Sequence, residues 1–401
     1  MHIRPTTDED HDLFVTTLLA AFGLAPETPA EDGGGVWWAA TEMDRNLFAQ
    51  TEDGEPVGTA GSYTLELTLP GGRLISAPGV TAVGVLPTHR RRGALTAMMR
   101  HQLTDLRAQG ESLAVLLASE ALIYRRFGYG PATYTERLTV PRHRAALIAA
   151  PEDPGTVEVL NREAAVEIME EVYDRYRRTQ PGALSRPHRW WARRAGMPPI
   201  APAHRYIAVH RDAHGVPDGY ASYAKEGSTL TVDETIAGDD AVFTALARFV
   251  LEHDLTEKAV FRKFPPQHPL RWQFVDFRGP ELTDHMDWLW VRLLDIPRAL
   301  TARGWCADGE LVLDVEDRFL GDGEQGRYLL TVTDGKAECV RTDRAPDLSL
   351  DVSDLGSVYL GGTTPTTLVR AGRIRAHHPD AASRADALFR ADRTPHCLHW
   401  F

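Results

Sequence analysis

Three consecutive arginines and a glycine stand between an apolar segment and an amphipathic one, a pattern suited to holding a phosphate group. They are Arg90, Arg91, Arg92 and Gly93 in VGVLPTHRRRGALTAMM. Backbone N–H groups at the start of a helix are unpaired and carry partial positive charge, so an anion binds there readily. Gly93 lets the anion approach closely, and guanidinium groups can fork onto phosphate oxygens. The sequence therefore predicts a pyrophosphate-binding turn, with a merely solvated basic turn as the alternative.

A phenol follows the next apolar segment, in ASEALIYRRFGYGPATY. Tyr124 lies one element downstream of the arginine turn, and Gly128 and Gly130 bend the chain behind it. When an amine attacks a thioester, the departing thiolate needs a proton, and a phenol can supply it. Tyr129 and Tyr134 are rivals for this role, and a tyrosine that merely packs in the core is the alternative.

Strands and helices that alternate along the first 150 residues must hold these groups. Val83 and Val85 mark a strand that Pro87 ends, and apolar residues recur at helical spacing from Ala94 to Leu106. We expect a helix over 8–22, strands over 47–50, 55–69, 81–85 and 113–118, and a long helix directly after the arginines. The arginine turn and Tyr124 therefore belong to one α/β unit.

Two further units follow this one. The Pro- and Ala-rich segment 141–157 is typical of a connection between domains. We then expect helices over 162–178 and 240–253, strands over 206–210, 220–224 and 229–236, and, in a third unit, strands over 309–316, 327–333 and 336–341. Asp334-Gly335 is a pair favoured in tight hairpins. The predicted domains are 1–150, 151–290 and 291–401.

Composition narrows the class of protein. The 401 residues are 43% hydrophobic and 25% charged, as in ordinary soluble globular chains of two or three domains. Without a membrane-spanning apolar run or a secretory signal, a cytoplasmic location is expected. The net charge of −12 argues against nucleic acid as a partner and favours amines or lysine side chains. Three widely spaced cysteines suggest neither a disulfide framework nor a metal site.

The chain resembles the enhanced intracellular survival (Eis) family of N-acetyltransferases, in the GNAT superfamily. The resemblance rests on VGVLPTHRRRGALTAM, ASEALIYRRFGYGPAT, SVYLGG and the aromatic C-terminus. Arg90-x-x-Gly93 is similar to the coenzyme A pyrophosphate loop of the superfamily, although Leu95 stands where Gly or Ala is usual. The resemblance implies an α/β (α+β) fold: two GNAT-like domains, the second without a cofactor, then a domain similar to sterol carrier proteins. It also implies a homohexamer built as a dimer of trimers.

The same resemblance implies how the chain holds acetyl-CoA and catalyses the transfer. The implied contacts are the pantetheine with Val83, Gly84 and Val85, the pyrophosphate with Arg90, Arg91, Arg92, Gly93, Ala94, Leu95 and Thr96, and the thioester with Ser119 and Glu120. Tyr124 becomes the general acid, and the α-carboxylate of Phe401 becomes the general base. An α-carboxylate is ionised at neutral pH, so it can accept a proton. In an arbitrary protein a terminal phenylalanine would be an aromatic plug or a frayed end.

Aromatic and acidic side chains are expected to bind the acceptor. They are Phe22, Trp37, Trp38, Asp287 and Trp400. Trp400 stands where the best-known family member has an acidic residue, which favours a more aromatic pocket and weakens the case for polycationic substrates. The hypothesis is direct transfer of an acetyl group, in a ternary complex, to an aminoglycoside, a polyamine-like molecule or a lysine side chain. The alternative is a non-catalytic carrier or sensor of acyl-CoA or lipid.

Overall fold

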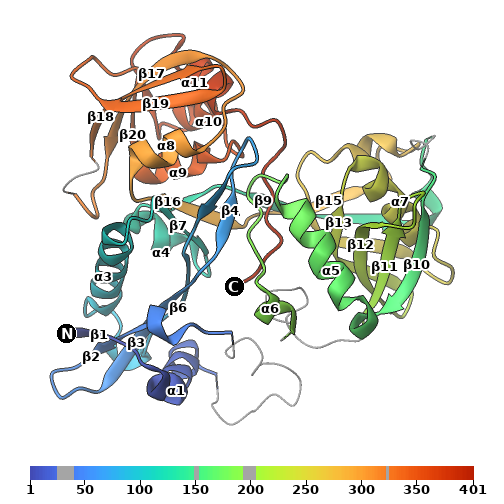
Figure 1. The fold of residues 1–401 in the computed structure, drawn as a ribbon, viewed down its shortest axis with the longest axis horizontal. Coiled ribbons are helices and arrows are strands. Elements are labelled where there is room, and N and C mark those ends of the chain that lie inside the picture. Colours follow the sequence, from blue (N-terminus) through green and yellow to red (C-terminus); the bar gives the residue numbers. More distant parts are fainter. Residues whose placement is uncertain (25–39, 149–152, 193–204, 322–324) are drawn as a thin grey trace.

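Three β-sheets with helices packed on them make up the protein. The computed structural model describes residues 1–24, 40–148, 153–192, 205–321 and 325–401. Figure 1 shows the three units meeting near the centre of the molecule, with the C-terminus lying between the first and the second. Trp37 and Trp38, two of the predicted acceptor residues, lie outside the described residues.

The first sheet carries the arginine turn. Within the described chain it has seven strands, in the order β1 (His2–Pro5), β2 (Leu47–Gln50), β3 (Pro56–Tyr63), β6 (Gly79–Val85), β7 (Leu113–Leu117), β16 (Leu289–Leu293) and β8 (Gly130–Pro131). Neighbours are antiparallel except β6 and β7, which are parallel. Helix α1 (His11–Phe22) packs on Phe48 of β2, and α3 (Ala94–Ala108) packs on Leu47 and Ala49. Because alternate strand residues point to opposite faces, the two helices cover opposite faces of the sheet.

The second sheet repeats this arrangement. Its described strands have the order β10 (Thr156–Asn161), β11 (Tyr206–Arg211), β12 (Pro217–Glu226), β13 (Thr229–Ala237), β14 (Lys258–Phe264), β9 (Tyr134–Pro141) and β15 (Glu281–Asp287). Again one neighbouring pair, β13 and β14, is parallel and the others are antiparallel. Helices α5 (Arg162–Arg177) and α7 (Asp240–Leu251) pack in separate core clusters, with Ile207 and Ala208 of β11 respectively.

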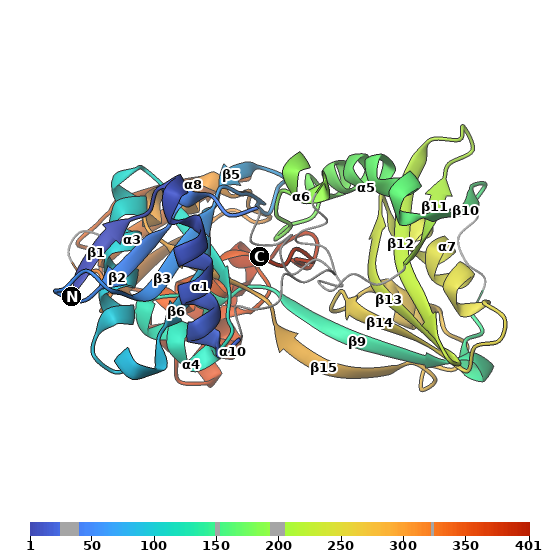
Figure 2. The same ribbon diagram turned by 90° about the horizontal axis from the view of Figure 1, so that it is seen from below.

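The two sheets exchange a strand. β9 lies in the first 150 residues of the chain but pairs with β14 and β15 of the second sheet. β16 follows the second unit in sequence but pairs with β7 and β8 of the first sheet. Figure 2 shows β9 and β15 running side by side across the molecule. Two strands therefore cross between the segments that the sequence analysis separates at residues 150 and 290.

The third unit is a five-stranded sheet covered by short helices. The described strands have the order β19 (Lys336–Arg341), β18 (Gly326–Thr333), β17 (Gly309–Glu316), β20 (Leu348–Asp351) and β21 (Arg375–Ala376), and the helices are α8 (Ile296–Ala302), α9 (Val352–Tyr359), α10 (Pro365–Arg370) and α11 (Ala381–Phe389). At the predicted hairpin, Asp334 and Gly335 have φ angles of +52° and +73°, as the tight turn requires. Leu313, Leu330 and Tyr359 fill the space between sheet and helices.

One predicted strand is wrong in extent, and several strands have no clear pattern in the sequence. The expected strand over 55–69 ends at Tyr63, because Thr64 turns to Glu42: its N–H and hydroxyl donate to the carboxylate at 3.0 and 2.6 Å. The chain then forms a separate hairpin of β4 (Glu66–Thr68) and β5 (Leu74–Ser76). β15 is almost wholly exposed, so it lacks the alternation by which a half-buried strand is identified.

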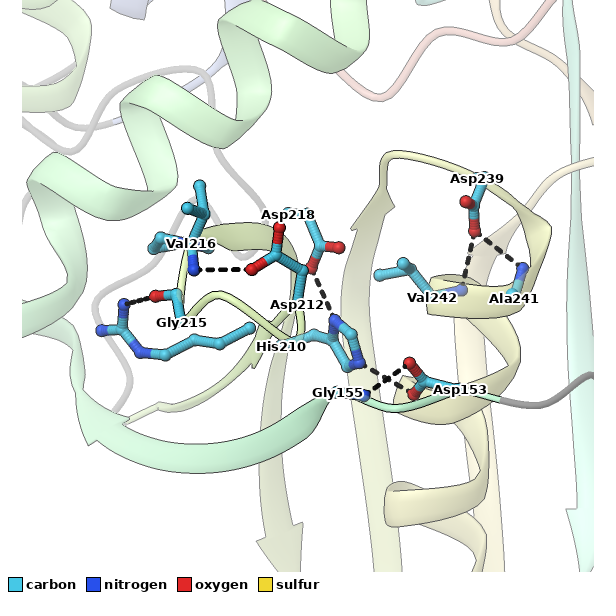
Figure 3. A network of polar contacts seen from close by, with 12 residues as sticks. Asp153, Gly155, His210, Asp212, Gly215, Val216, Asp218, Asp239, Ala241 and Val242 are labelled. Atoms are coloured by element: carbon cyan, nitrogen blue, oxygen red, sulfur yellow. Dashed lines mark hydrogen bonds and ion pairs between the residues drawn. The ribbon is translucent and has the colours of Figure 1, made fainter.

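A buried histidine of β11 connects β12 with the segment just before β10, at the far end of the second sheet. His210 Nδ1 lies 2.5 Å from Asp218 Oδ1, and Nε2 lies 2.9 Å from Asp153 Oδ2 (Figure 3). Burial lowers the pKa of His210, but the hydrogen bonds to Asp218 and Asp153 outweigh it, and the pKa is raised. Both ring nitrogens face carboxylate acceptors, which favours the protonated, cationic form of the ring.

Candidate active site

The parallel strands β6 and β7 separate soon after they begin, and we call the opening between them the first splay. They pair only at Gly79 with Val115 and at Val80 with Leu116. Beyond these pairs β6 has one extra residue relative to β3, and Ala82 has a φ of +53°. Such a bulge bends a strand away from its neighbour. The main chain of β6 from Thr81 to Val85 therefore faces the opening and can pair with an extended ligand.

The start of α3 lies at the end of this opening. Gly93 is the N-cap with a φ of +88°, and no side chain of the described residues caps the helix. Backbone N–H groups of the first turn are thus left for an outside acceptor. A Cβ added at Gly93 would meet no described atom within 4 Å, so the turn is open to a ligand. Leu95, the departure from the superfamily pattern, packs against the core beneath α3.

The three arginines of the turn have different surroundings. Arg90 Nη2 donates to the Ala21 carbonyl at 2.9 Å and Nε donates to the Val85 carbonyl at 3.3 Å, which braces the end of α1 against β6. Arg91 and Arg92 are exposed. All three arginines predicted as phosphate ligands are exposed; Arg91 and Arg92 have no such brace among the described residues, while Arg90 has a structural role as well.

Tyr124 ends the short helix α4 (Ala121–Tyr124), which follows β7. Its ring is buried in one cluster with Val80 and Leu116. Burial raises the pKa of Tyr124, the charge of Glu120 adds to this, and a hydrogen bond with Ser119 opposes it. The phenol therefore keeps its proton at neutral pH and can donate it. Ser119 and Glu120 are exposed in the loop between β7 and α4.

The two rival phenols have different surroundings. Tyr129 is fully buried, and its hydroxyl has no hydrogen-bond partner among the described residues. Burial raises the pKa of Tyr129 well above that of an ordinary phenol. Tyr134 has its hydroxyl 2.7 Å from Thr363 Oγ1 of the third unit, and its ring stacks on His285 at 5.2 Å. Tyr124 is the one of the three that borders the exposed loop of Ser119 and Glu120.

The C-terminal residue is buried at the first splay. Phe401 is 5% exposed, and a Cβ added at Gly79 would lie 2.9 Å from Phe401 Cε2, so the ring packs directly on the backbone of Gly79. Val80, the next residue of β6, lies in the cluster of Tyr124. Successive strand residues point to opposite faces. Phe401 and Tyr124 therefore approach β6 from opposite faces, at the point where it separates from β7.

Contacts along the preceding residues hold the terminus in place. Residues 395–399 are buried, whereas chain ends are usually exposed and mobile. Trp288 Nε1 donates to the His399 carbonyl at 3.2 Å, and the His399 and Phe401 rings stack at 5.9 Å. Sequence reasoning missed Trp288, His399 and Gly79; the DHMDWLW and HCLHWF runs of aromatics were the available signal.

The predicted acceptor residues are only partly brought together. Phe22 ends α1 and is 52% exposed, and Trp400 is partly buried between His399 and Phe401. Asp287 ends β15, and its Oδ2 accepts a hydrogen bond of 2.6 Å from Trp290 Nε1. Part of its carboxylate is therefore already engaged.

Membrane-spanning helices and metal clusters are both absent from the part of the chain that the structure describes. These residues contain no helix with the length and apolarity needed to span a bilayer. They also contain no group of three or more His, Cys, Asp and Glu side chains arranged to hold a metal ion.

Comparisons with known proteins match every unit. Residues 2–132 and 182–293 match two family models described as acetyltransferase (GNAT) domains, and residues 296–398 match a sterol carrier protein domain. The chain is 35% identical over 404 residues to the N-acetyltransferase Eis of Mycobacterium tuberculosis, covering 97% of this chain and 96% of that protein. It is 38% identical over 421 residues to an uncharacterized N-acetyltransferase of Streptomyces avermitilis, covering 100% and 99%.

Solved structures agree with the sequence relatives. The crystal structure of Eis1 from Mycobacterium abscessus matches with a TM-score of 0.87 and 35% identity, covering 100% of both chains. A GCN5-related N-acetyltransferase from Anabaena variabilis, at 21% identity, shares the fold with a TM-score of 0.83. GNAT acetyltransferases use an acyl-CoA donor, and the predicted fold class and the prediction of an N-acetyltransferase are confirmed. The chain is an N-acetyltransferase of the Eis family, with two GNAT domains followed by a sterol-carrier-like domain.

Proposed function

We propose that this enzyme transfers the acetyl group of acetyl-CoA to a primary amine by direct attack in a ternary complex. The main chain of Val83, Gly84 and Val85 would pair with the pantetheine. The uncapped start of α3, with Arg91 and Arg92, would hold the pyrophosphate. The fit is supported by the bulge that opens the first splay and by the unfilled space beside Gly93.

The chemistry assigned to this chain is a proton transfer at each end of the reacting atoms. The α-carboxylate of Phe401 takes a proton from the attacking amine as the C–N bond forms. Tyr124 gives a proton to the sulfur as the C–S bond breaks, so coenzyme A leaves as a thiol. The observation that carries this proposal is the burial of Phe401 on Gly79, opposite the face on which Tyr124 packs.

The acceptor is proposed to be an amine on an apolar or aromatic scaffold. Trp288 donates to the His399 carbonyl beside the terminus, Trp400 is the next residue of the chain, and Asp287 is partly engaged by Trp290. Aminoglycosides and polyamines carry several cationic groups, which would need more free carboxylates than the partly engaged Asp287 provides. Lysine side chains and aromatic monoamines are therefore expected to be better acceptors than aminoglycosides.

Release of free coenzyme A tests this function. The enzyme is mixed with acetyl-CoA and, in turn, a lysine peptide, an aromatic monoamine, a polyamine and an aminoglycoside, while the released thiol and the acetylated product are measured. Thiol release in step with acetylated amine supports the proposal. No amine-dependent release with any member of this panel would contradict it.

The alternative of a lipid carrier has less support. A cavity of about 990 Å³ between the first and third units is lined by charged side chains, among them Arg125, Asp314, Glu316 and Arg373. A hydrophobic ligand would have to desolvate these groups at a cost. Leu313, Leu330 and Tyr359 meanwhile occupy the interior of the third unit.

A hexameric assembly belongs to the same proposal and rests on the resemblance to the family, whereas the proposed cytoplasmic location rests on the sequence alone. Light scattering on the purified protein tests the assembly: six chains per particle are expected, and a stable monomer would contradict it.

A further inference from the structure

The second GNAT domain has its own opening between parallel strands, which we call the second splay. β13 and β14 pair from Thr229 with Lys258 to Val232 with Phe261 and then separate. As in β6, the departing strand has one extra residue relative to its other neighbour: Ser222 of β12 pairs with Glu234 and Tyr223 with Val232, which leaves Asp233 between them. The second sheet therefore repeats the geometry that opens the donor site of the first.

The helix that follows the second splay begins with acidic residues, whereas α3 of the first domain begins after arginines. α7 starts at Asp240, and the Asp239 carboxylate accepts from the N–H groups of Ala241 and Val242 at 2.9 Å each (Figure 3). The helix start that Gly93 leaves open in the first domain is here capped and acidic. A pyrophosphate would meet two carboxylates in place of arginines, so this groove does not suit acyl-CoA.

The C-terminal segment of the chain lies at this groove. Arg393 Nη2 lies 3.6 Å from Asp240 Oδ1, and Arg393 and Thr394 line a cavity of about 230 Å³ together with Asp239 and His268. Gln180 Nε2 donates to the Thr394 carbonyl at 2.9 Å. The entering segment thus brings a cation to the acidic helix start.

The segment continues into the interior as a fully buried stretch. The His396 N–H donates to the Pro181 carbonyl at 2.9 Å. Burial, together with the charges of His268 and of Lys263 on β14, lowers the pKa of His396 to about 3. Cys397 is 0% exposed, and Leu398 packs in the cluster under α5.

A buried ion pair then connects the second splay to the last residues of the chain. Glu234, next to the extra residue of β13, accepts from Arg186 Nη1 and Nη2 at 3.2 and 2.9 Å and from the Tyr220 hydroxyl at 2.8 Å. The third guanidinium nitrogen, Arg186 Nε, donates to His399 Nδ1 at 3.2 Å. His399 is two residues from Phe401, and its ring stacks on the Phe401 ring. Of the residues in this series of contacts, all but Phe401 are held by the second domain.

We propose that the groove of the second GNAT domain has become the receptor for residues 393–399, so that a domain without a donor of its own holds the catalytic terminus. Arg186 and His399 are then positioning residues for the Phe401 carboxylate. This inference rests on the proposed role of that carboxylate. Its test therefore includes a readout of the segment itself that does not depend on acetyl transfer.

Two substitutions at His399 separate the hydrogen bond from the bulk of the ring. His399→Leu removes the acceptor that Arg186 Nε uses, while His399→Asn keeps an acceptor atom near the place of Nδ1. Loss of a buried hydrogen bond to a charged group corresponds to about ten- to a hundredfold in an equilibrium. We expect kcat of His399→Leu to fall by about that factor, with the KM for acetyl-CoA changed less than about threefold. His399→Asn should retain most of the wild-type kcat.

Cysteine alkylation reports on the segment directly. Cys397 lies in it and is 0% exposed, whereas Cys339 is buried in the third unit and serves as the internal control. In His399→Leu, alkylation of Cys397 by iodoacetamide, measured on its peptide by mass spectrometry, should accelerate about tenfold or more while Cys339 stays at the wild-type rate. An unchanged rate at Cys397 would overturn the proposal, and so would a parallel rise at Cys339, which means general loosening.

A pair on the surface keeps the test open if His399→Leu does not fold. Arg393→Glu places a carboxylate against Asp240 and should accelerate Cys397 alkylation about two- to fivefold, the range of a partly exposed ion pair. The double variant Arg393→Glu with Asp240→Arg should restore the wild-type rate. Equal rates in all three proteins would contradict docking at the second splay. A wild-type enzyme that acetylates no amine would refute the proposed function and leave the alkylation result standing.

Discussion

Tyr124 combines burial with a place beside an exposed loop. Its ring packs with Val80 and edge-on to Tyr129 at 6.3 Å, so the ring position does not depend on the hydroxyl. Burial raises the pKa of the phenol, which keeps it protonated throughout the neutral range. A proton donor for a thiolate needs this property, and the general base needs the opposite one, which an ionised α-carboxylate provides.

Removing the hydroxyl of Tyr124 is therefore expected to affect chemistry alone. Tyr124→Phe should lower kcat by about 10²- to 10³-fold and leave the dissociation constant of acetyl-CoA within about twofold. Steady-state kinetics and calorimetric titration measure the two quantities. Tyr134→Phe, which loses only the hydroxyl contact with Thr363, is the matched control and should stay near the wild-type kcat. An undiminished kcat in Tyr124→Phe would make the residue a packing residue.

At the scale of elements, the β6–turn–α3 unit divides its arginines between structure and ligand. Arg91→Gln and Arg92→Gln should each weaken acetyl-CoA binding about tenfold and flatten its dependence on salt, because each removes a full charge from the phosphate site. Arg90→Gln removes the brace to Ala21 and Val85 and should instead lower the melting temperature. Binding titrations at two salt concentrations and thermal unfolding distinguish the roles. The opposite pattern among the three variants would refute this division.

The contacts of His210 with Asp153 and Asp218 lead to a prediction about how stability depends on pH. The folded pKa of His210 is raised, so its contribution to the free energy of unfolding is complete below the unfolded pKa, near 6.5, and is lost as pH rises through the folded pKa. His210→Gln should cost about 2 kcal/mol at pH 5.5 and progressively less above neutrality. Urea unfolding at several pH values measures this. A cost that does not change with pH would contradict a charged His210.

Elements with a strong periodic signal were predictable, and those defined by long-range pairing were not. The strand at 81–85, the helix after Gly93 and the hairpin at Asp334-Gly335 follow from local residue types, and the structure contains all three. The exchange of β9 and β16 between sheets depends on pairing over more than a hundred residues, which no local pattern encodes. Likewise the arginine turn was visible as a motif, but the bracing role of Arg90 became visible only with Ala21 beside it.

At the scale of the whole molecule, the strand exchange and the C-terminal segment both serve to fix the position of the C-terminal carboxylate. The proposed base is the α-carboxylate of the last residue, and ordering a chain end costs conformational entropy. The exchanged strands join the two GNAT domains through β9 and β15 on one side and β8 and β16 on the other. The segment from Arg393 to Phe401 runs from the second splay to the first, and Figure 1 shows the C-terminus lying between the first and the second unit.

The central claim is that the negative charge of the Phe401 α-carboxylate is needed for catalysis. This charge can be removed without changing the shape of Phe401. Peptide ligation at Cys397 yields two enzymes that differ only in a free carboxylate or a carboxamide at Phe401. If the carboxylate is the base, the carboxamide enzyme should lose about 10²- to 10⁴-fold in kcat while binding acetyl-CoA as tightly as its free-acid twin. A carboxamide enzyme with the same kcat as the free acid would contradict the account.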